Sequence, residues 1–241
     1  MPHRRLFRRL PALVCATLSR ATFAWATLAW ATLAWYTLAP AAEVTLPATL
    51  CGHDEREEGA GACLQETHFK AGVPSGEMNL MVGGQAWGCD SEWAASFEFD
   101  LGPVPSGAPV QQAVLVVRKT GYSDDAQGFA YVGAFAYEPT GAEVPVARDD
   151  LSPDTALAVL YPPAANVDLA FDVTAAVQAW VADGAAKAGL LLAPVYSEIG
   201  YEDWISVGGC AHPTPPRLVI NYDGAVANES STWSRLKALW R

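Results

Sequence analysis

Residues 171–194, FDVTAAVQAWVADGAAKAGLLLAP, contain the clearest helical pattern in a chain whose other apolar segments are typical of short strands. Val177, Trp180 and Val181 recur at the spacing of one face of a helix of about ten residues. Thr174 is suited to cap the helix N-terminus, and Gly184 is suited to end the helix. The run GLLLAP then predicts a buried strand. We therefore expect this helix to pack against a β-sandwich and to have no catalytic role.

The rest of the chain predicts an all-β fold. Glycine and proline interrupt it at short intervals, and the segments between them favour strand. SFEFDL alternates, which places Phe97, Phe99 and Leu101 on one face and polar residues on the other. Further strands are expected at 43–50, 79–84, 113–120, 128–138, 167–173, 189–195, 203–209 and 217–223. Many short strands between turn residues predict one antiparallel sandwich or barrel domain.

Composition excludes some functions. Of the 241 residues, 51% are hydrophobic, which is enough for a core. Acidic residues outnumber basic ones by 26 to 15, whereas nucleic-acid binding requires clustered Lys and Arg to neutralise phosphates. We therefore expect no nucleic-acid partner.

The first 42 residues have the layout of a secretory signal peptide. A basic start, an uncharged apolar run and small residues follow one another, with Ala39 and Ala41 before an expected cut near Ala42. An uncleaved anchor is the alternative, because residues 21–42 are long enough to span a bilayer. Five of the 15 basic residues and none of the acids lie in this leader, so the remainder has 10 bases, 26 acids and a formal charge of −16. Either reading predicts an extracytoplasmic location.

Cysteine usage agrees with export. Four cysteines lie beyond the leader, an even number that predicts disulfides in an oxidising compartment: Cys51, Cys63, Cys89 and Cys210. We favour Cys51 with Cys63, which would close the polar loop CGHDEREEGAGAC, and Cys89 with Cys210. Zinc is the alternative, because His53 and His68 flank the same cysteines, although their spacing matches no common zinc module.

Three segments resemble the exported DNRLRE-type domains: FDLGPVPSGAPVQQAVLVVRKTG (99–121), FDVTAAVQAWVADGAAKAGLLLAP (171–194) and PPRLVINY (215–222). The resemblance covers about residues 75–223 and is most specific in the helix phrase. It implies a jelly-roll β-sandwich, found in bacterial surface and secreted proteins and in some carbohydrate-binding modules for acidic polysaccharides. Residues 144–163 depart from the family pattern, because they have no tryptophan.

Aromatic residues beside turns suggest a carbohydrate site. Trp87 and Trp204 are flanked by turn residues and acids, so each is a candidate platform for a sugar ring; the alternative is that they cover the sandwich ends. Arg118 and Lys119 at a strand end would suit an acidic sugar. The predicted ligand-binding residues are Trp87, Trp93, Arg118, Tyr122, Tyr201 and Trp204.

No linear motif indicates catalysis. The chain has no recognisable nucleophile phrase, paired metal-binding histidines or phosphate loop, so we expect a non-catalytic protein without a resident cofactor. The acid pairs Asp124-Asp125 and Asp149-Asp150 are typical of solvated turns, with Ca²⁺ as their functional alternative. A polysaccharide-acting enzyme with an unrecognised site remains the less favoured reading.

Residues 225–241 form a separate basic tail. Trp233, Leu236 and Trp240 recur at helical spacing beside basic residues, which predicts a short amphipathic helix that rests on the domain, a membrane surface or a partner. Membrane contact is expected only through this tail or the leader. The combined prediction is a leader, a sandwich at 43–224 and this tail, forming an exported cell-surface or secreted module that binds carbohydrate. A structural surface protein with a protein partner is the alternative.

Overall fold

The computed structural model describes residues 41–58, 68–87, 89–122, 131–147, 150–161, 166–195 and 202–224. They belong to one unit that begins at Ala41, and the predicted leader and basic tail lie outside the described residues, apart from Ala41 and Ala42. Side chains of residues 56–58, 85–87, 89–90 and 202–203 are not described either. The elements are β1 (Ala41–Glu58), β2 (His68–Ala71), β3 (Asn79–Trp87), β4 (Cys89–Asp100), β5 (Val110–Tyr122), β6 (Val132–Tyr137), β7 (Val144–Ala147), β8 (Ala158–Leu160), β9 (Val167–Asp172), α2 (Thr174–Ala182), β10 (Lys187–Pro194), β11 (Glu202–Gly208) and β12 (Arg217–Asp223).

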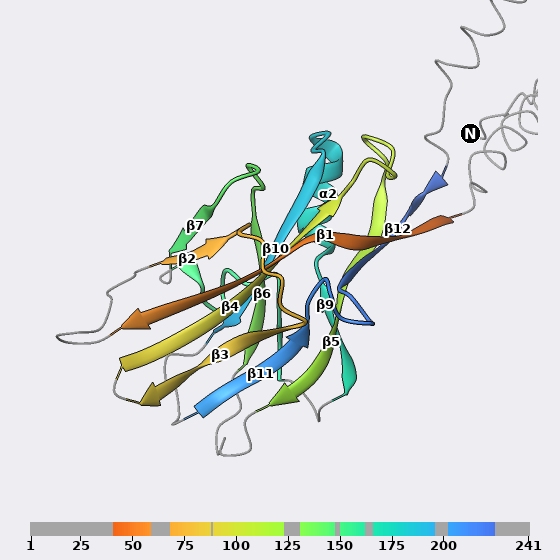
Figure 1. Ribbon diagram of the computed structural model, residues 1–241. Coiled ribbons are helices and arrows are strands. Elements are labelled where there is room, and N and C mark those ends of the chain that lie inside the picture. Colours follow the sequence, from red (N-terminus) through yellow and green to blue (C-terminus); the bar gives the residue numbers. More distant parts are fainter. Residues whose placement is uncertain are drawn as a thin grey trace, which may run out of the picture. The chain divides into compact units, whose positions relative to one another are not determined.

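The main sheet is antiparallel throughout and closes on itself. Its ten strands follow the order β1-β12-β5-β11-β3-β4-β10-β6-β8, with β9 on the other edge of β5 (Figure 1). Because β1 also pairs with β4, the strands β1, β12, β5, β11, β3 and β4 form a ring. Both the antiparallel all-β sandwich and the short helix before a late strand are as the sequence predicts.

Strand β1 changes partner along its length. Residues 41–47 pair with β12, whereas residues 48–58 pair with β4, and the register shifts between Ala48 and Leu50. Residues 51–58, which we expected to form a polar loop, therefore continue the strand. Pairing with β4 provides partners for their backbone N–H and C=O groups, and this outweighs the strand-poor composition of CGHDEREE.

A disulfide lies beside this change of partner. Cys51 on β1 is bonded to Cys210 in the connection between β11 and β12, with 5.5 Å between the two Cα atoms. Both predicted pairings are therefore wrong, because folding brings Cys51 to a residue 159 positions away rather than to its neighbour in sequence. Cys63 lies outside the described residues, and the side chain of Cys89 is not described.

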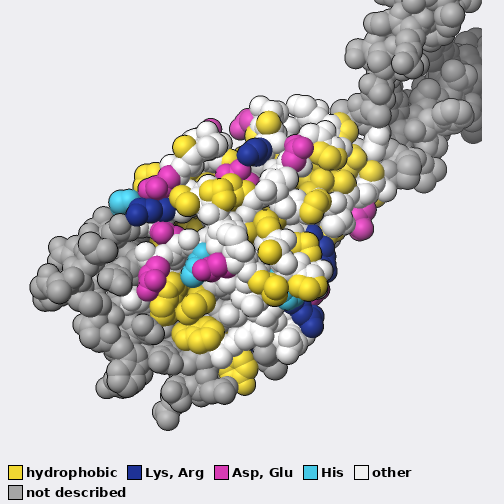
Figure 2. Space-filling model, in the orientation of Figure 1, with side chains coloured by type: hydrophobic (Ala, Val, Ile, Leu, Met, Phe, Trp, Pro, Cys, Tyr) yellow, Lys and Arg dark blue, Asp and Glu magenta, His cyan; other side chains and the backbone are white. Residues whose placement is uncertain are grey.

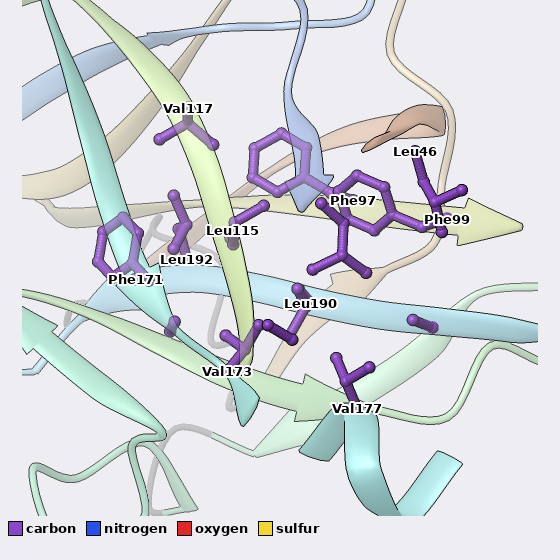
Figure 3. Packing of buried hydrophobic residues seen from close by; sticks show 14 of the residues in the cluster. Leu46, Phe97, Phe99, Leu115, Val117, Phe171, Val173, Val177, Leu190 and Leu192 are labelled. Carbon is purple, nitrogen blue, oxygen red and sulfur yellow. The ribbon is translucent and has the colours of Figure 1, made fainter. Parts of the chain in front are cut away.

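The main hydrophobic core lies between the inner faces of the sheet. Phe97 and Phe99 of β4 are fully buried there, which confirms the face predicted from SFEFDL. Burying one such side chain contributes about 1.5–3 kcal/mol relative to leaving it exposed. Ten residues of this core are labelled in Figure 3: Leu46, Phe97, Phe99, Leu115, Val117, Phe171, Val173, Val177, Leu190 and Leu192.

The helix α2 covers one end of this core. Val177 and Val181 are buried against it, and Trp180 is partly buried, so the predicted apolar face is confirmed (Figure 3). The predicted cap is wrong: Thr174 is the first helical residue, and its backbone N–H and hydroxyl both donate to the Asp172 carboxylate, at 3.0 and 2.6 Å. The chain leaves the helix through Gly184, whose φ of 69° suits glycine.

A second core lies on the outer face of the sheet. Strands β2 and β7 pair as a separate antiparallel ribbon, which packs over β4, β10 and β6 (Figure 1). As a result β10 is buried on both faces, with Leu190 and Leu192 in the main core and Leu191 beneath the ribbon. The sequence did not predict β2, β7 or β8, which are only three or four residues long.

Candidate binding site

Three tyrosines gather at one end of the sandwich, which we call the tyrosine end: Tyr122, Tyr131 and Tyr161. Tyr122 is the last residue of β5, and only eight residues separate it from Tyr131, directly before β6. Val132 of β6 pairs with Leu160 of β8, so Tyr131 and Tyr161 lie at the same end of these two strands. Backbone pairing therefore brings Tyr131 and Tyr161 together, while Tyr122 is joined to Tyr131 only through the segment between β5 and β6.

These tyrosines are the exposed aromatic side chains of the described residues. Their exposed fractions are 41% for Tyr122, 42% for Tyr131 and 51% for Tyr161. The rings of Tyr131 and Tyr161 meet edge to face, with centroids 5.4 Å apart and an interplanar angle of 61°. This arrangement is favourable for two aromatic quadrupoles and fixes the two rings relative to each other while leaving much of each exposed.

A buried lysine supports Tyr122. The side chain of Lys119 is only 1% exposed, and its Nζ atom lies 5.0 Å from the centroid of the Tyr122 ring. Burial lowers the pKa of Lys119, because the charged ammonium loses hydration. The geometry is that of a cation–π contact, which orients the ring of Tyr122.

The structure places the predicted ligand-binding residues in different environments. Tyr122 is exposed, and Trp204 of β11 is partly buried two residues from the tyrosine end of that strand. Trp93 is only 6% exposed, which corrects its prediction as a platform, since a sugar has no access to a buried ring. The side chain of Trp87 is not described, and Tyr201 lies outside the described residues.

Tyr131 and Tyr161 were not among the predicted ligand-binding residues. Tyr131 belongs to an alternating run that predicts a strand, and Tyr161 follows a three-residue strand that the sequence pattern does not reveal. Their common signal is a tyrosine directly at a strand boundary. That signal becomes specific only when pairing shows that the two boundaries are neighbours.

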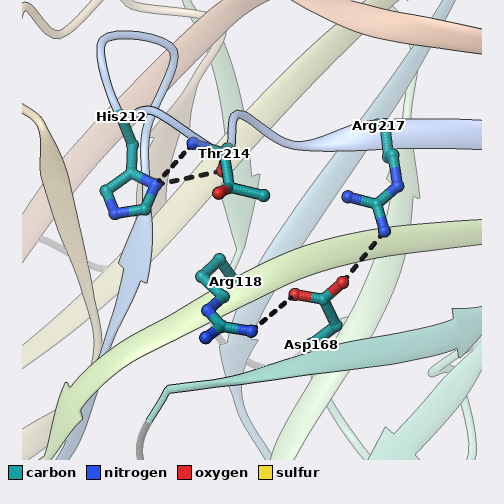
Figure 4. A network of polar contacts seen from close by, with 5 residues as sticks. All are labelled: Arg118, Asp168, His212, Thr214 and Arg217. Carbon is teal, nitrogen blue, oxygen red and sulfur yellow. Dashed lines mark hydrogen bonds and ion pairs between the residues drawn. The ribbon is translucent and has the colours of Figure 1, made fainter.

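The predicted ligand residue Arg118 is engaged within the protein. Its Nη1 atom lies 3.2 Å from Oδ1 of Asp168, and Nη2 of Arg217 lies 2.9 Å from Oδ2 (Figure 4). The hydrogen bond from Arg217, followed by that from Arg118, lowers the pKa of Asp168. The three side chains join β5, β9 and β12, so Arg118 contributes to a cross-strand network and not to the tyrosine end.

Two of the residues proposed for zinc, Cys51 and His53, have other partners. Cys51 is in the disulfide, and Nδ1 of His53 lies 3.0 Å from Oε2 of Glu77. Within the described ranges, no group of three His, Cys, Asp or Glu side chains is arranged to hold a metal ion. Of the acids in the Ca²⁺ alternative, Asp124, Asp125 and Asp149 lie outside the described residues, and Asp150 is exposed.

The surface shows no segregation of charge on the face seen in Figure 2. Acidic, basic and apolar side chains are interspersed over its described part. Charge alone therefore does not mark a site on this face, and the aromatic side chains are the more informative feature.

Fold and site together define an antiparallel β-sandwich with an aromatic surface at one end. No family model matches the sequence, and no curated protein is significantly similar to it. The resemblance to DNRLRE-type domains therefore stays a prediction from the quoted segments. The one helix of the described region is too short to cross a membrane.

Proposed function

We propose that this protein is an exported, non-catalytic module that binds carbohydrate at the tyrosine end. The observation that carries the proposal is the pair of exposed rings of Tyr131 and Tyr161, which contact each other, together with exposed Tyr122 at the end of β5. Exposed clusters of large side chains with apolar rings are a common mark of binding surfaces.

Sugar chemistry fits such a surface. One face of a pyranose ring presents mainly C–H groups, which stack on an aromatic ring, while the phenolic hydroxyl groups supply hydrogen bonds at the edge. Export is supported by the leader pattern and by the Cys51–Cys210 disulfide, since disulfides persist in oxidising compartments. The tyrosine end is thus suited to bind a glycan at a cell surface or in the extracellular space.

The test is a glycan-array screen of the purified protein, followed by calorimetry on the glycans that bind. We expect Tyr131→Ala and Tyr161→Ala each to weaken binding about fivefold, because one stacked ring contributes on the order of 1 kcal/mol. Met78→Ala is the matched control, since Met78 is 53% exposed and lies outside the tyrosine end. Equal binding by all three variants, or no glycan bound, contradicts the proposal.

A structural protein with a protein partner is the second candidate. One observation favours it: the outer face of β5 and β12 carries half-buried Val114, Val116 and Val219, whereas the outer face of β4 and β10 is covered by the β2–β7 ribbon. Among the described residues, the valine-bearing face has no comparable cover. Binding of a protein partner that is lost in Val116→Lys and kept in Tyr131→Ala would favour this candidate.

A further inference from the structure

A surface depression lies at the end of the sandwich opposite the tyrosine end. It is formed by the loop after β6, the C-terminal half of α2 and the start of β10, and it has a volume of about 770 Å³. Since β6 begins at the tyrosine end, the loop that follows it lies at the other end. The volume is within the range of small-molecule sites, about 300–1,000 Å³. The lining residues that carry charge or an aromatic ring are Glu138, Trp180, Asp183 and Lys187.

The positive charge in this lining is already neutralised. Nζ of Lys187 lies 2.8 Å from Oε2 of Glu98, whose side chain is only 2% exposed. A buried carboxylate requires such a partner, because an unpaired charge away from water is strongly unfavourable. Lys187 is therefore held by Glu98 and gives little attraction for an anion.

Two carboxylates in the lining have no such partner. Glu138 precedes the loop on one side of the depression, and Asp183 follows the helix on the other. Within the described part of the chain, neither side chain forms an ion pair. The depression therefore presents a net negative field, which favours a cation.

An indole ring supplies the apolar surface between them. Trp180 packs against the main core and is only partly buried, and it also lines the depression. Indole is the aromatic side chain that interacts best with a cation over its face. A compact ion with a strong hydration shell makes poor use of such a surface, whereas an ammonium with attached methyl or methylene groups contacts both the ring and the carboxylates.

From this combination we infer that the depression binds a small organic cation, an ammonium or quaternary ammonium group seated on Trp180 between Glu138 and Asp183. The site is independent of carbohydrate binding at the tyrosine end. If Lys187 were unpaired, its positive charge would be available to a ligand. We would then expect the depression to bind carboxylates as readily as cations.

The experiment uses choline and its neutral isostere 3,3-dimethylbutan-1-ol, which has nearly the same shape without the charge. Binding to the purified full chain is followed by calorimetry and by the indole N–H resonance of Trp180 in NMR spectra. We expect choline to bind saturably and the isostere about fivefold to thirtyfold more weakly, in keeping with a cation–π contact of about 1–2 kcal/mol.

Variants locate the site. Asp183→Asn and Glu138→Gln should each weaken choline binding about threefold or more, since each removes one attracting charge. Asp154→Asn is the matched control, because it removes another exposed acid that does not line the depression. Tyr131→Ala should leave choline binding unchanged, because Tyr131 does not line the depression. The choline experiment can therefore fail without contradicting the carbohydrate proposal, and the reverse also holds. Absence of choline binding, equal binding of the neutral isostere, or insensitivity to both carboxylate variants would overturn the inference.

Discussion

Removal of the Cys51–Cys210 disulfide should cause a large loss of stability. The bond connects β1, at the point where it changes partner, with the connection between β11 and β12. We would replace both cysteines, Cys51→Ala and Cys210→Ser, so that no unpaired thiol remains. Alanine is chosen at the first position because Cys51 is only 2% exposed and a serine hydroxyl would be buried there.

The magnitude follows from the length of chain that the bond closes. The two residues are 159 positions apart. The chain-entropy relation gives about 5 kcal/mol at 25 °C for a loop of this length, at the top of the range of about 2–5 kcal/mol for native disulfides. Another crosslink nested inside the loop would change this value little, because the dependence on length is logarithmic. A loss of about 3–5 kcal/mol lowers Tm by about 10–15 °C in a domain of this size.

Urea unfolding under non-reducing conditions measures the free energy of unfolding, and calorimetry measures Tm. The single variant Leu46→Ala serves as a comparison, because it destabilises by about 2–5 kcal/mol through a cavity while the crosslink stays intact. Only the disulfide variant should show a larger m-value, since its unfolded chain expands further. A loss below about 1 kcal/mol in that variant, or a non-reduced peptide map without a Cys51–Cys210 link, would refute the reasoning.

Two further predictions concern buried and surface charge. Lys187→Met should destabilise by about 2–3 kcal/mol in urea unfolding, because it leaves Glu98 buried without its cation; the figure is below that for a fully buried pair, since Lys187 is 46% exposed. Lys187→Met combined with Glu98→Gln should recover most of the loss, and failure to recover it would exclude the charge as the cause. Asp168 has a pKa below its ordinary 3.8 in the folded state, so its stabilisation is present above about pH 4 and is lost as the pH falls through the lowered value. Asp168→Asn should therefore flatten the acid limb of a stability–pH curve, and an unchanged limb would contradict this assignment.

Much of the sheet could be predicted from local pattern, because an alternating or β-branched segment fits a pleated surface wherever it pairs. Each expected strand in the described region is present, as is the helix at Thr174–Ala182. The pattern fails where pairing overrides composition. Residues 51–58 are polar and were assigned to a loop, yet β4 provides their hydrogen-bond partners. The same contact explains the wrong disulfide, because a strand carries Cys51 away from its sequence neighbours.

The candidate sites depend on non-local contacts to a greater degree. Tyr122 was among the predicted ligand-binding residues, whereas the pairing of Tyr131 with Tyr161 requires the register between β6 and β8. Arg118 was expected to face a ligand, but its charge is engaged by Asp168 on β9. Residue type therefore indicates which side chains are capable of binding, while strand register decides which of them remain available.

The buried Glu98 shows how the two layers of the fold depend on each other. Alternation in SFEFDL predicts that Ser96 and Glu98 face away from the main core, and they do; yet both are almost fully buried, because the β2–β7 ribbon covers that face. Ser96 accepts a hydrogen bond from the backbone N–H of Gly72, 3.1 Å away, directly after β2, and Glu98 binds Lys187. Burial together with the Glu98 charge raises the pKa of Tyr137, which stays neutral beneath the ribbon. Polar groups that an uncovered sheet would expose to water are thus buried beneath the ribbon, where Ser96 binds the backbone at the end of β2 and Glu98 pairs with Lys187 of β10.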